Sequence, residues 1–447
     1  MGKAPTIDFG YHYMVYLRWL VVNMKKRTIF DELINLKRKF IETLKASNYV
    51  NHDGKSFTRN RSLTMSLILT IILRCSPFSL QIRIDDYFDK TGRKEETVSK
   101  QAFSKSRTNL DPEIVKESFM ITTKTILQCD DLELYKEKFR LCAIDGSDVT
   151  LDNAGVLLAH FGGSGSKKDC ATAMSSLCYD PLNNIILDGG IYPYGFSERE
   201  AARNHFTAVS ALPIPEGVKN LYIFDRGYPS KELISEMIDA GMFFLMRVRR
   251  NFIIGFELNR KQQTDYVRHN GKTYKIRVFN VKLETGETEI LVTNVSNKYI
   301  NHKDVGELYF KRWKIEGKFD NLKNKLELEN MSGRRPVTVY QDYWAKLDMA
   351  NTMAALEYAT DEVVEEKSVA TNNKNKQRTN ENRLITKFSD RYLELLSNDN
   401  SSERTALFDE LVSDIAKRPF AIKPGRSFLR KPPRKKKFCD RRKRVLR

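Results

Sequence analysis

Residues 309–323 have the sequence YFKRWKIEGKFDNLK, which predicts an amphipathic helix. At about 100° per residue, Tyr309, Arg312, Glu316 and Lys323 fall in one stripe about 60° wide. The adjacent stripe is apolar and would face the core: Leu308, Ile315, Phe319, Leu322 and Leu326. The polar stripe therefore lies at the edge of the buried face, where a carboxylate can enter a site and keep part of its water. A solvated charged helix would have the same composition, but less often this alignment.

Two aspartates each follow a short apolar strand. Asp145 comes after the strand predicted for residues 139–144, in the run Ile-Asp-Gly-Ser, and Asp225 comes after the strand predicted for 221–224, in the run Phe-Asp-Arg-Gly-Tyr. Strand ends on a rigid sheet can fix carboxylates, although an Asp there is usually a cap or turn residue. With Glu316 they make three oxygen ligands, which leave positions in a Mg²⁺ shell for water and phosphate. Two such ions can drive an in-line displacement at phosphorus.

These residues resemble the DDE transposases of bacterial insertion sequences, specifically the IS-four family. The third acid of that family lies in the signature Tyr-x2-Arg-x3-Glu-x6-Lys. Tyr309, Arg312, Glu316 and Lys323 reproduce this spacing without a gap. The runs around the two aspartates resemble the other two acidic motifs of the family, and the resemblance spans about residues 95–360.

The resemblance implies a DNA transposase that binds the terminal inverted repeats of an insertion sequence, cleaves the ends and joins them to target DNA. It implies that the three acids are catalytic and bind Mg²⁺, with Mn²⁺ as a substitute, and that Tyr309, Arg312 and Lys323 bind DNA. The expected partners are double-stranded DNA and a second copy of the chain on that DNA. A metal-dependent nuclease of the same fold and a non-catalytic DNA-binding protein derived from a transposase are the alternatives, and the presence of all three acids disfavours the latter.

The expected fold class is α/β, with a ribonuclease-H-like catalytic core that the resemblance implies. The expected parts are a helical N-terminal DNA-binding region (1–130), the core (131–248 and 301–365), an antiparallel β insertion (249–300), a helical C-terminal region (366–423) and a basic tail (424–447). The order of patterns agrees with such a core: a strand ending at Asp145, two more strands, a helix, a strand ending at Asp225, and Glu316 on a late helix. Residues 367–383 are polar and Asn-rich, which predicts a loop.

The composition points to a polyanionic partner. The 447 residues include 76 Lys and Arg against 57 Asp and Glu, a net charge of +19. Residues 424–447 alone contain twelve Lys or Arg and one acid, which is typical of a phosphate-binding arm, or else of a solubilising tail. No apolar stretch near the start reaches the ~20 residues of a membrane span. We therefore expect a cytoplasmic, nucleoid-associated protein whose six cysteines are reduced.

Four further features carry hypotheses. The pattern at 99–110 predicts a helix whose polar side, including Arg107, would suit a DNA groove or simply face solvent. Glu198 and Glu200 open a predicted helix, where acids act as capping residues, or support metal or DNA binding. The insertion lacks the Trp on which relatives stack a flipped base, and the candidates that could offer a ring instead are Phe252, Phe256, Tyr266 and Tyr274. His160 and His205 are expected to be structural.

Overall fold

The computed structural model describes residues 26–44, 49, 57, 63–75, 78–163, 170–252, 260–283, 286–371 and 374–423. Within these ranges, eight strands form one sheet in the order β3-β2-β1-β4-β5-β8-β7-β6. The strands are β1 (Phe139–Thr150), β2 (Thr172–Asp180), β3 (Ile185–Pro193), β4 (Lys219–Phe224), β5 (Phe243–Val248), β6 (Gln262–His269), β7 (Lys272–Lys282) and β8 (Thr288–Thr293). A two-stranded ribbon joins β9 (Gln377–Arg378) to β10 (Phe420–Ala421).

Five of the strands form a ribonuclease-H-like core. Strand β2 pairs antiparallel with β3 on one side and with β1 on the other. Strand β1 then pairs in parallel with β4, and β4 pairs in parallel with β5. The helix between β3 and β4 and the helix between β4 and β5 supply the crossovers that parallel pairing needs. The fold class predicted from the sequence is confirmed.

Strand β1 is longer than the sequence predicts, and the prediction that it ends at Asp145 is wrong. Its pairing with β4 stops at Ala143 and Ile223, but its pairing with β2 continues from Asp145 to Thr150. Asp145 therefore lies where β1 runs past the end of its parallel neighbour. The apolar pattern stops there because β1 is covered on one edge only from that point.

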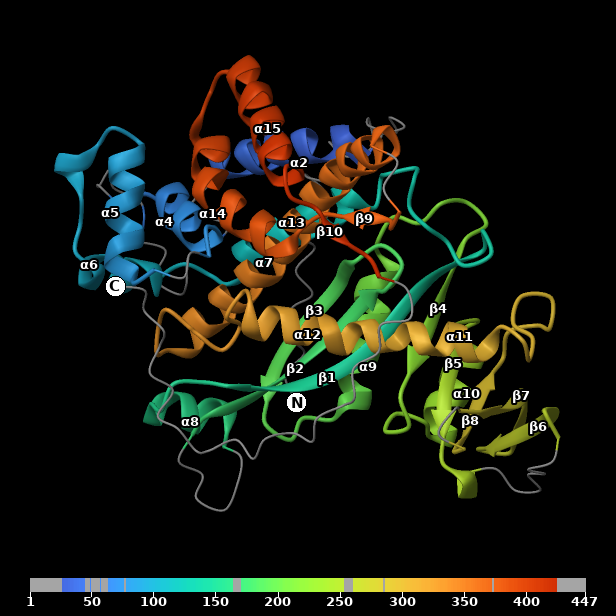
Figure 1. The fold of residues 1–447 in the computed structure, drawn as a ribbon. Coiled ribbons are helices and arrows are strands. Elements are labelled where there is room, and N and C mark those ends of the chain that lie inside the picture. The colour runs from blue at the N-terminus through green and yellow to red at the C-terminus, as the bar shows by residue number, and fades with distance from the viewer. Residues whose placement is uncertain are drawn as a thin grey trace.

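The segment after β5 contains the antiparallel strands that the alternating pattern predicts. β6 pairs with β7, β7 with β8, and β8 returns to pair antiparallel with β5. These three strands thus extend the core sheet and do not form a sheet of their own. Figure 1 shows them at the far end of the sheet from β3.

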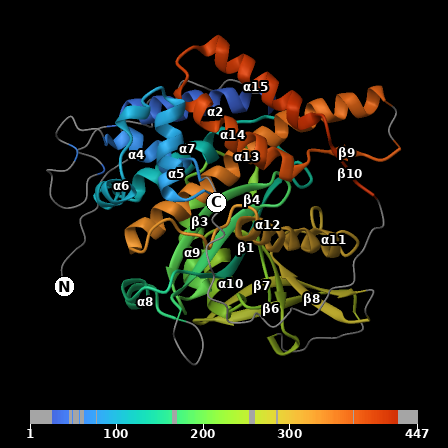
Figure 2. The same cartoon turned by 60° about the vertical axis from the view of Figure 1, so that its left-hand side comes forward.

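Helices cover both faces of the sheet and form a separate layer above it (Figures 1 and 2). They are α2 (Lys26–Glu42), α4 (Met65–Leu73), α5 (Leu80–Lys90), α6 (Lys100–Arg107), α7 (Glu113–Ile126), α8 (Gly155–Phe161), α9 (Glu198–Ser210), α10 (Lys231–Asp239), α11 (Val305–Phe310), α12 (Lys314–Asn324), α13 (Pro336–Ala370), α14 (Glu381–Ser397) and α15 (Ser401–Ala416). α13 is buried on nearly all sides over its first half and packs on α7, α2 and β3. It continues to Ala370, so the loop predicted from residue 367 begins too early; Lys367 and Ala370 are good helix formers.

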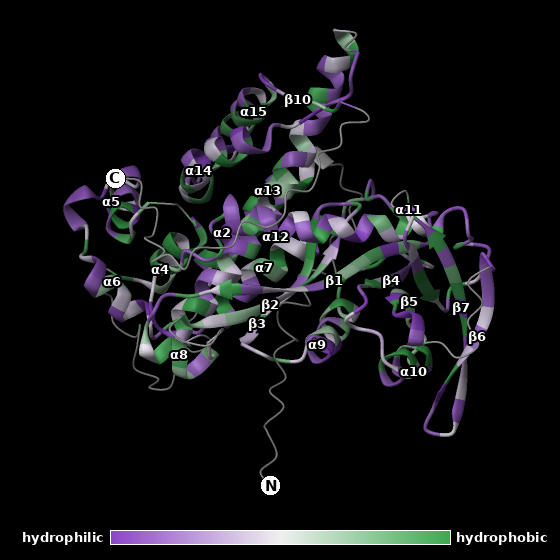
Figure 3. Ribbon diagram, turned by 60° about the horizontal axis from the view of Figure 1, so that its bottom comes forward, coloured by the Kyte–Doolittle hydropathy of each residue, from purple (hydrophilic) through white to green (hydrophobic). Residues whose placement is uncertain are grey.

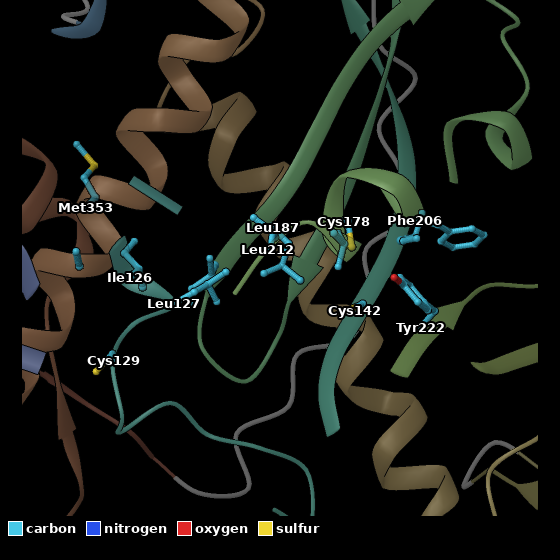
Figure 4. Close-up of a cluster of buried hydrophobic side chains, with 14 of the residues drawn as sticks. Ile126, Leu127, Cys129, Cys142, Cys178, Leu187, Phe206, Leu212, Tyr222 and Met353 are labelled. Carbon is cyan, nitrogen blue, oxygen red and sulfur yellow. The ribbon is translucent and has the colours of Figure 1, made fainter. Parts of the chain in front are cut away.

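Alternate side chains of β1 enter different hydrophobic clusters on the two faces of the sheet. Cys142 and Ile144 pack with Phe206 of α9, and Ala143 packs with Ile315 of α12. Figure 4 shows the first of these clusters, where Cys142 and Cys178 lie among apolar side chains. Cys75, Cys142, Cys170 and Cys178 are free thiols.

Helix α6 has the polar side that the sequence predicts to face DNA or solvent, but Arg107 does not lie on that side. Figure 3 shows the hydrophilic character of α6, and Lys100, Gln101 and Lys105 are exposed. Arg107, however, is buried and forms an ion pair with Asp342 of α13 at 2.7 Å. The sequence pattern treats every arginine as a surface residue and could not anticipate a buried partner more than 200 positions away.

The basic tail predicted for residues 424–447 lies outside the described residues. In the described part of the chain, no helix is both long enough and apolar enough to cross a lipid bilayer.

Candidate active site

The two aspartates lie at the same level on neighbouring parallel strands. Ala143 of β1 pairs with Ile223 of β4, and Asp145 and Asp225 each follow two residues later. Both side chains therefore point to the same face of the sheet, just beyond the point where the parallel pairing of β1 with β4 stops. Asp225 leads into a tight turn in which its Oδ1 accepts a hydrogen bond of 2.7 Å from the Gly227 N–H.

The third acid approaches from the helices that cover this face. Glu316 lies in the first turn of α12, which packs across β1 (Figure 1). Arg312 connects it to the sheet: Nη1 lies 3.4 Å from Asp145 Oδ2, and Nη2 lies 3.1 Å from Glu316 Oε1. The Arg312 side chain is 5% exposed, against 20% for Asp145 and 37% for Glu316. One buried guanidinium thus bridges two of the three predicted catalytic acids.

A local irregularity in the helix places Arg312. The helix predicted for 309–323 is interrupted by a 3₁₀ turn at Lys311–Trp313, which is tighter than an α-turn. The guanidinium carbon lies 5.7 Å from the ring centre of Tyr309 and 5.0 Å from that of Trp313, distances at which aromatic faces attract a cation. Nothing in the sequence singles out Trp313, because a tryptophan on an amphipathic helix is usually a core residue.

The surroundings of Asp145 disfavour its ionised form. Burial raises the pKa of this carboxyl to about 7, and the charges of Asp225 and Glu316 act in the same direction. Arg312 and the Gly146 N–H oppose the rise, but without water their attraction does not compensate for the lost solvation. A positive charge added at this site would favour the ionised carboxylate.

Lys323 and Tyr309 frame the site along the helices. Lys323 donates hydrogen bonds of 2.6 Å to Ser147 Oγ and to the Asp148 carbonyl, so it lies beside β1 just beyond Asp145. Tyr309 is 2% exposed, and burial raises the pKa of its hydroxyl to about 12. The four residues of the predicted stripe therefore follow one path along β1, with Tyr309 as its buried end.

Glu198 also reaches this edge of the sheet, from the opposite face. Its Oε1 lies 3.0 Å from the point where a Cβ at Gly146 would stand, and its Oε2 lies 3.6 Å from the corresponding point at Gly227. Glu200, two residues on, is exposed and pairs with a neighbouring arginine at 3.0 Å, so the structure does not bring it to the site. Tyr228 is buried beside this edge; its place directly after the Asp-Arg-Gly run was the only sequence signal for it.

The aromatic candidates of the insertion divide into separate environments. Tyr274 is buried and donates a hydrogen bond of 2.9 Å to Asp239, and Phe252 packs against the core. Tyr266 is 57% exposed on β6, and Phe256 lies outside the described residues. Tyr266 is thus the described candidate that presents a ring to solvent.

The two histidines near the core have structural hydrogen bonds, as predicted. His205 is buried, with Nδ1 at 2.6 Å from Asp188 Oδ2 and Nε2 at 2.9 Å from Ser176 Oγ. His160 Nε2 lies 3.1 Å from the Tyr340 hydroxyl.

The donor atoms at this site fit a hard divalent cation in kind, because all are carboxylate oxygens. Within the described ranges, no group of three or more His, Cys, Asp or Glu residues is arranged to hold a metal ion. Asp145 and Glu316 converge on the guanidinium of Arg312 and not on each other. A cation bound by these acids would need them to turn away from Arg312.

Comparison with known proteins agrees with this geometry. Residues 136–351 match the family described as "Transposase DDE domain", a span that includes every residue of the predicted site. No curated protein matches the chain. Among solved structures, the cryo-EM structure of the piggyBac transposase synaptic complex with hairpin DNA matches with 10% sequence identity and a TM-score of 0.43. The match covers 90% of this chain and 84% of that one. A TM-score of this size does not establish a common fold. The chain therefore carries a transposase DDE domain over residues 136–351, and the resemblance seen in the sequence is confirmed at that level.

Proposed function

We propose that this protein is the transposase of an insertion sequence of the IS-four family. It binds the terminal inverted repeats of the element, cleaves the ends and joins them to target DNA. The observation that carries the proposal is the convergence of three acids from distant parts of the chain: Asp145 and Asp225 are level on parallel strands, and Arg312 links Asp145 to Glu316. A structural salt bridge would explain two of these acids, but not the third at the same edge.

Asp145, Asp225 and Glu316 are the residues that would hold Mg²⁺, or Mn²⁺ in its place. The bound ions would supply activation of the attacking oxygen and stabilisation of the leaving oxygen in an in-line displacement at phosphorus. Arg312, released from its carboxylates, would present a planar fork of donors to a phosphate beside the cut. Its flanking rings keep that guanidinium in place and its charge in a poorly hydrated setting.

Lys323 and Tyr309 are proposed to position the DNA end. Lys323 Nζ already contacts a hydroxyl and a carbonyl oxygen next to Asp145, which a phosphate oxygen can replace. Because Lys323 lies about two turns, ~10 Å, along the helix from Glu316, its phosphate would be one or two nucleotides from the cut. The net charge of +19 agrees with a DNA partner. Since two ends must be cut together, the active form on DNA is a homodimer, acting on bacterial DNA in the cytoplasm.

The test is a cleavage and joining assay on labelled DNA that ends in the inverted repeats beside the gene. With Mg²⁺ or Mn²⁺ the protein should cut at the repeat and join the cut end to target DNA. Asp145→Ala, Asp225→Ala and Glu316→Ala should each abolish cutting and keep binding to the end, whereas Glu200→Ala, an exposed control, should cut and bind like the native protein. Cutting without joining would favour the nuclease, and full cleavage by one of the three variants would remove that acid from the site.

A further inference from the structure

Glu198 occupies a space that two glycines leave open. These are Gly146 and Gly227, and each follows one of the catalytic aspartates within two residues. A Cβ at Gly146 would stand 3.0 Å from Glu198 Oε1, closer than carbon and oxygen normally pack. A Cβ at Gly227 would stand 3.1 Å from Asp225 Oδ1 and 3.6 Å from Glu198 Oε2. The carboxylates of Glu198 and Asp225 therefore border the same small volume.

Helix α9 is held so that Glu198 keeps this position. Arg199 donates hydrogen bonds to the carbonyl oxygens of Tyr228 (2.8 Å) and Gly227 (3.3 Å), which ties the start of α9 to the turn after Asp225. Two turns further along the same side of the helix, the buried His205 joins α9 to β2 and β3. A surface glutamate at a helix N-terminus would need neither anchor.

A second observation at the same place is the hydroxyl of Tyr228. The side chain is 1% exposed, its ring packs 5.2 Å from that of Phe224, and the hydroxyl has no hydrogen-bond partner among the described residues. Burial raises the pKa of this hydroxyl, and the charges of Glu198, Asp145 and Asp225 act in the same direction. Buried hydroxyl groups are almost always hydrogen-bonded, so this one lacks a partner that an occupant bound by these acids would supply.

Two of these acids, Asp225 and Glu198, are also uncompensated by ion pairs within the described ranges. Arg312 bridges Asp145 and Glu316, but within the described ranges neither Asp225 nor Glu198 forms an ion pair. Two neighbouring carboxylates at the edge of a buried site repel each other unless a cation lies between them.

We propose that Glu198 is a fourth acidic ligand of the active site, which binds a divalent cation together with Asp225 while the Tyr228 hydroxyl donates a hydrogen bond to a water molecule on that cation. The proposal rests on the proposed function, because it assumes that Asp225 binds metal. The cation near Asp225 would thus have an oxygen ligand, from Glu198, on the face of the sheet opposite to Glu316. The acids would then come from two strands and from one helix on each face.

The test measures Mn²⁺ binding to the full-length protein without DNA, by electron paramagnetic resonance of free Mn²⁺. Glu198→Gln should weaken binding at one site by at least about tenfold, as should Asp225→Asn. Glu200→Gln is the matched control, since it removes the same charge from the same helical turn, and its affinity should stay within about twofold. Glu198→Asp keeps the charge but withdraws the oxygens by one methylene, and should also weaken binding.

Thermal unfolding in EDTA separates ligation from a structural role. Without metal, Glu198→Gln should unfold at the same temperature as the native protein or higher, because repulsion from Asp225 is removed. With Mn²⁺ its gain in midpoint temperature should be smaller than that of the native protein. A lower midpoint in EDTA together with an unchanged gain would show a structural role and overturn the proposal.

The remaining outcomes are also decisive. If Glu198→Gln binds Mn²⁺ with native affinity, Glu198 is not a ligand. The same conclusion follows if Glu198→Gln binds Mn²⁺ more weakly but Glu198→Asp binds it with native affinity. If Asp225→Asn loses Mn²⁺ in the same experiment, the proposed function stands without the fourth acid. If Asp225→Asn and Asp145→Asn both bind Mn²⁺ normally, the metal site of the proposed function fails as well.

Discussion

Replacing Arg312 by methionine should destabilise the protein, in the absence of DNA and metal, by about 2–3 kcal/mol. Removing one partner of a buried ion pair typically costs about 3–5 kcal/mol, because a charge is left without compensation. The ion pair between Arg312 and Asp145 is mostly buried, which approaches the case of a buried pair. Glu316 is 37% exposed, so water can replace part of its interaction with Arg312. Methionine retains an unbranched apolar chain between Tyr309 and Trp313, so the loss reports the charge more than the packing.

The cost should depend on pH in a defined direction. The pKa of Asp145 is raised to about 7, which means that the folded protein binds this proton more tightly than the unfolded chain does. Stability therefore falls as pH rises from about 4 to about 7, and above pH 7 the whole penalty of the buried charge is present. Without Arg312 this pKa rises further, so Arg312→Met should be more destabilising at pH 8.5 than at pH 6.

The assay is urea unfolding in EDTA, followed by circular dichroism and by tryptophan fluorescence to check that both report one transition. A double-mutant cycle with Asp145→Asn isolates the pair. Arg312→Met should cost at least ~1 kcal/mol less when Asp145 is already neutral, since contacting charges couple by about 0.5–3 kcal/mol. A coupling below about 0.3 kcal/mol, or a cost that does not change with pH, would refute the bridge between Arg312 and Asp145.

Two further predictions concern DNA. Deleting residues 424–447 should weaken binding to all DNA sequences and flatten the salt dependence of that binding. The reason is that each phosphate contact releases about one counterion when DNA binds, and the deletion removes such contacts. An equal salt slope before and after deletion would show that the tail does not contact DNA. Lys323→Ala should keep metal binding and impair later steps on a labelled transposon end, hairpin formation or strand joining, more than the first nick, whereas Arg312→Ala should impair every step. Equal loss at every step for Lys323→Ala would indicate a general electrostatic role.

The fold could be predicted where local pattern and tertiary context agree. The core strands β2 to β5 are mostly buried because helices cover both faces, and their order along the chain matches the topology. The extent of β1 was wrong because its second half, from Asp145 to Thr150, pairs on one edge only and therefore loses the apolar pattern. The end of α13 was misplaced for a related reason: polar residues continue a helix as readily as they form a loop.

The sequence predicts the candidate site as a set of residues but not as an arrangement. The spacing of Tyr309, Arg312, Glu316 and Lys323 placed them on one side of a helix, and they do lie together along β1. Spacing assumes a uniform helix, so it could not reveal the 3₁₀ turn that buries Arg312. Nor could it reveal Tyr228, because nothing in a sequence indicates that a buried hydroxyl lacks a partner.

The arrangement around Arg312 suggests how such a site can remain folded before it binds anything. Three carboxylates at one edge of a sheet repel each other, and the buried position of Asp145 makes its charge costly. A guanidinium that contacts two of them supplies the positive charge that a cation would otherwise supply. When a cation and a DNA phosphate arrive together, the carboxylates can turn to the cation and Arg312 to the phosphate, so the number of compensated charges is conserved. Metal binding should therefore be tighter with a DNA end present than without it, and this cooperativity should be lost in Arg312→Met. Mn²⁺ titrations with and without an end duplex measure it, and equal Mn²⁺ affinities in the two titrations of the native protein would refute the exchange.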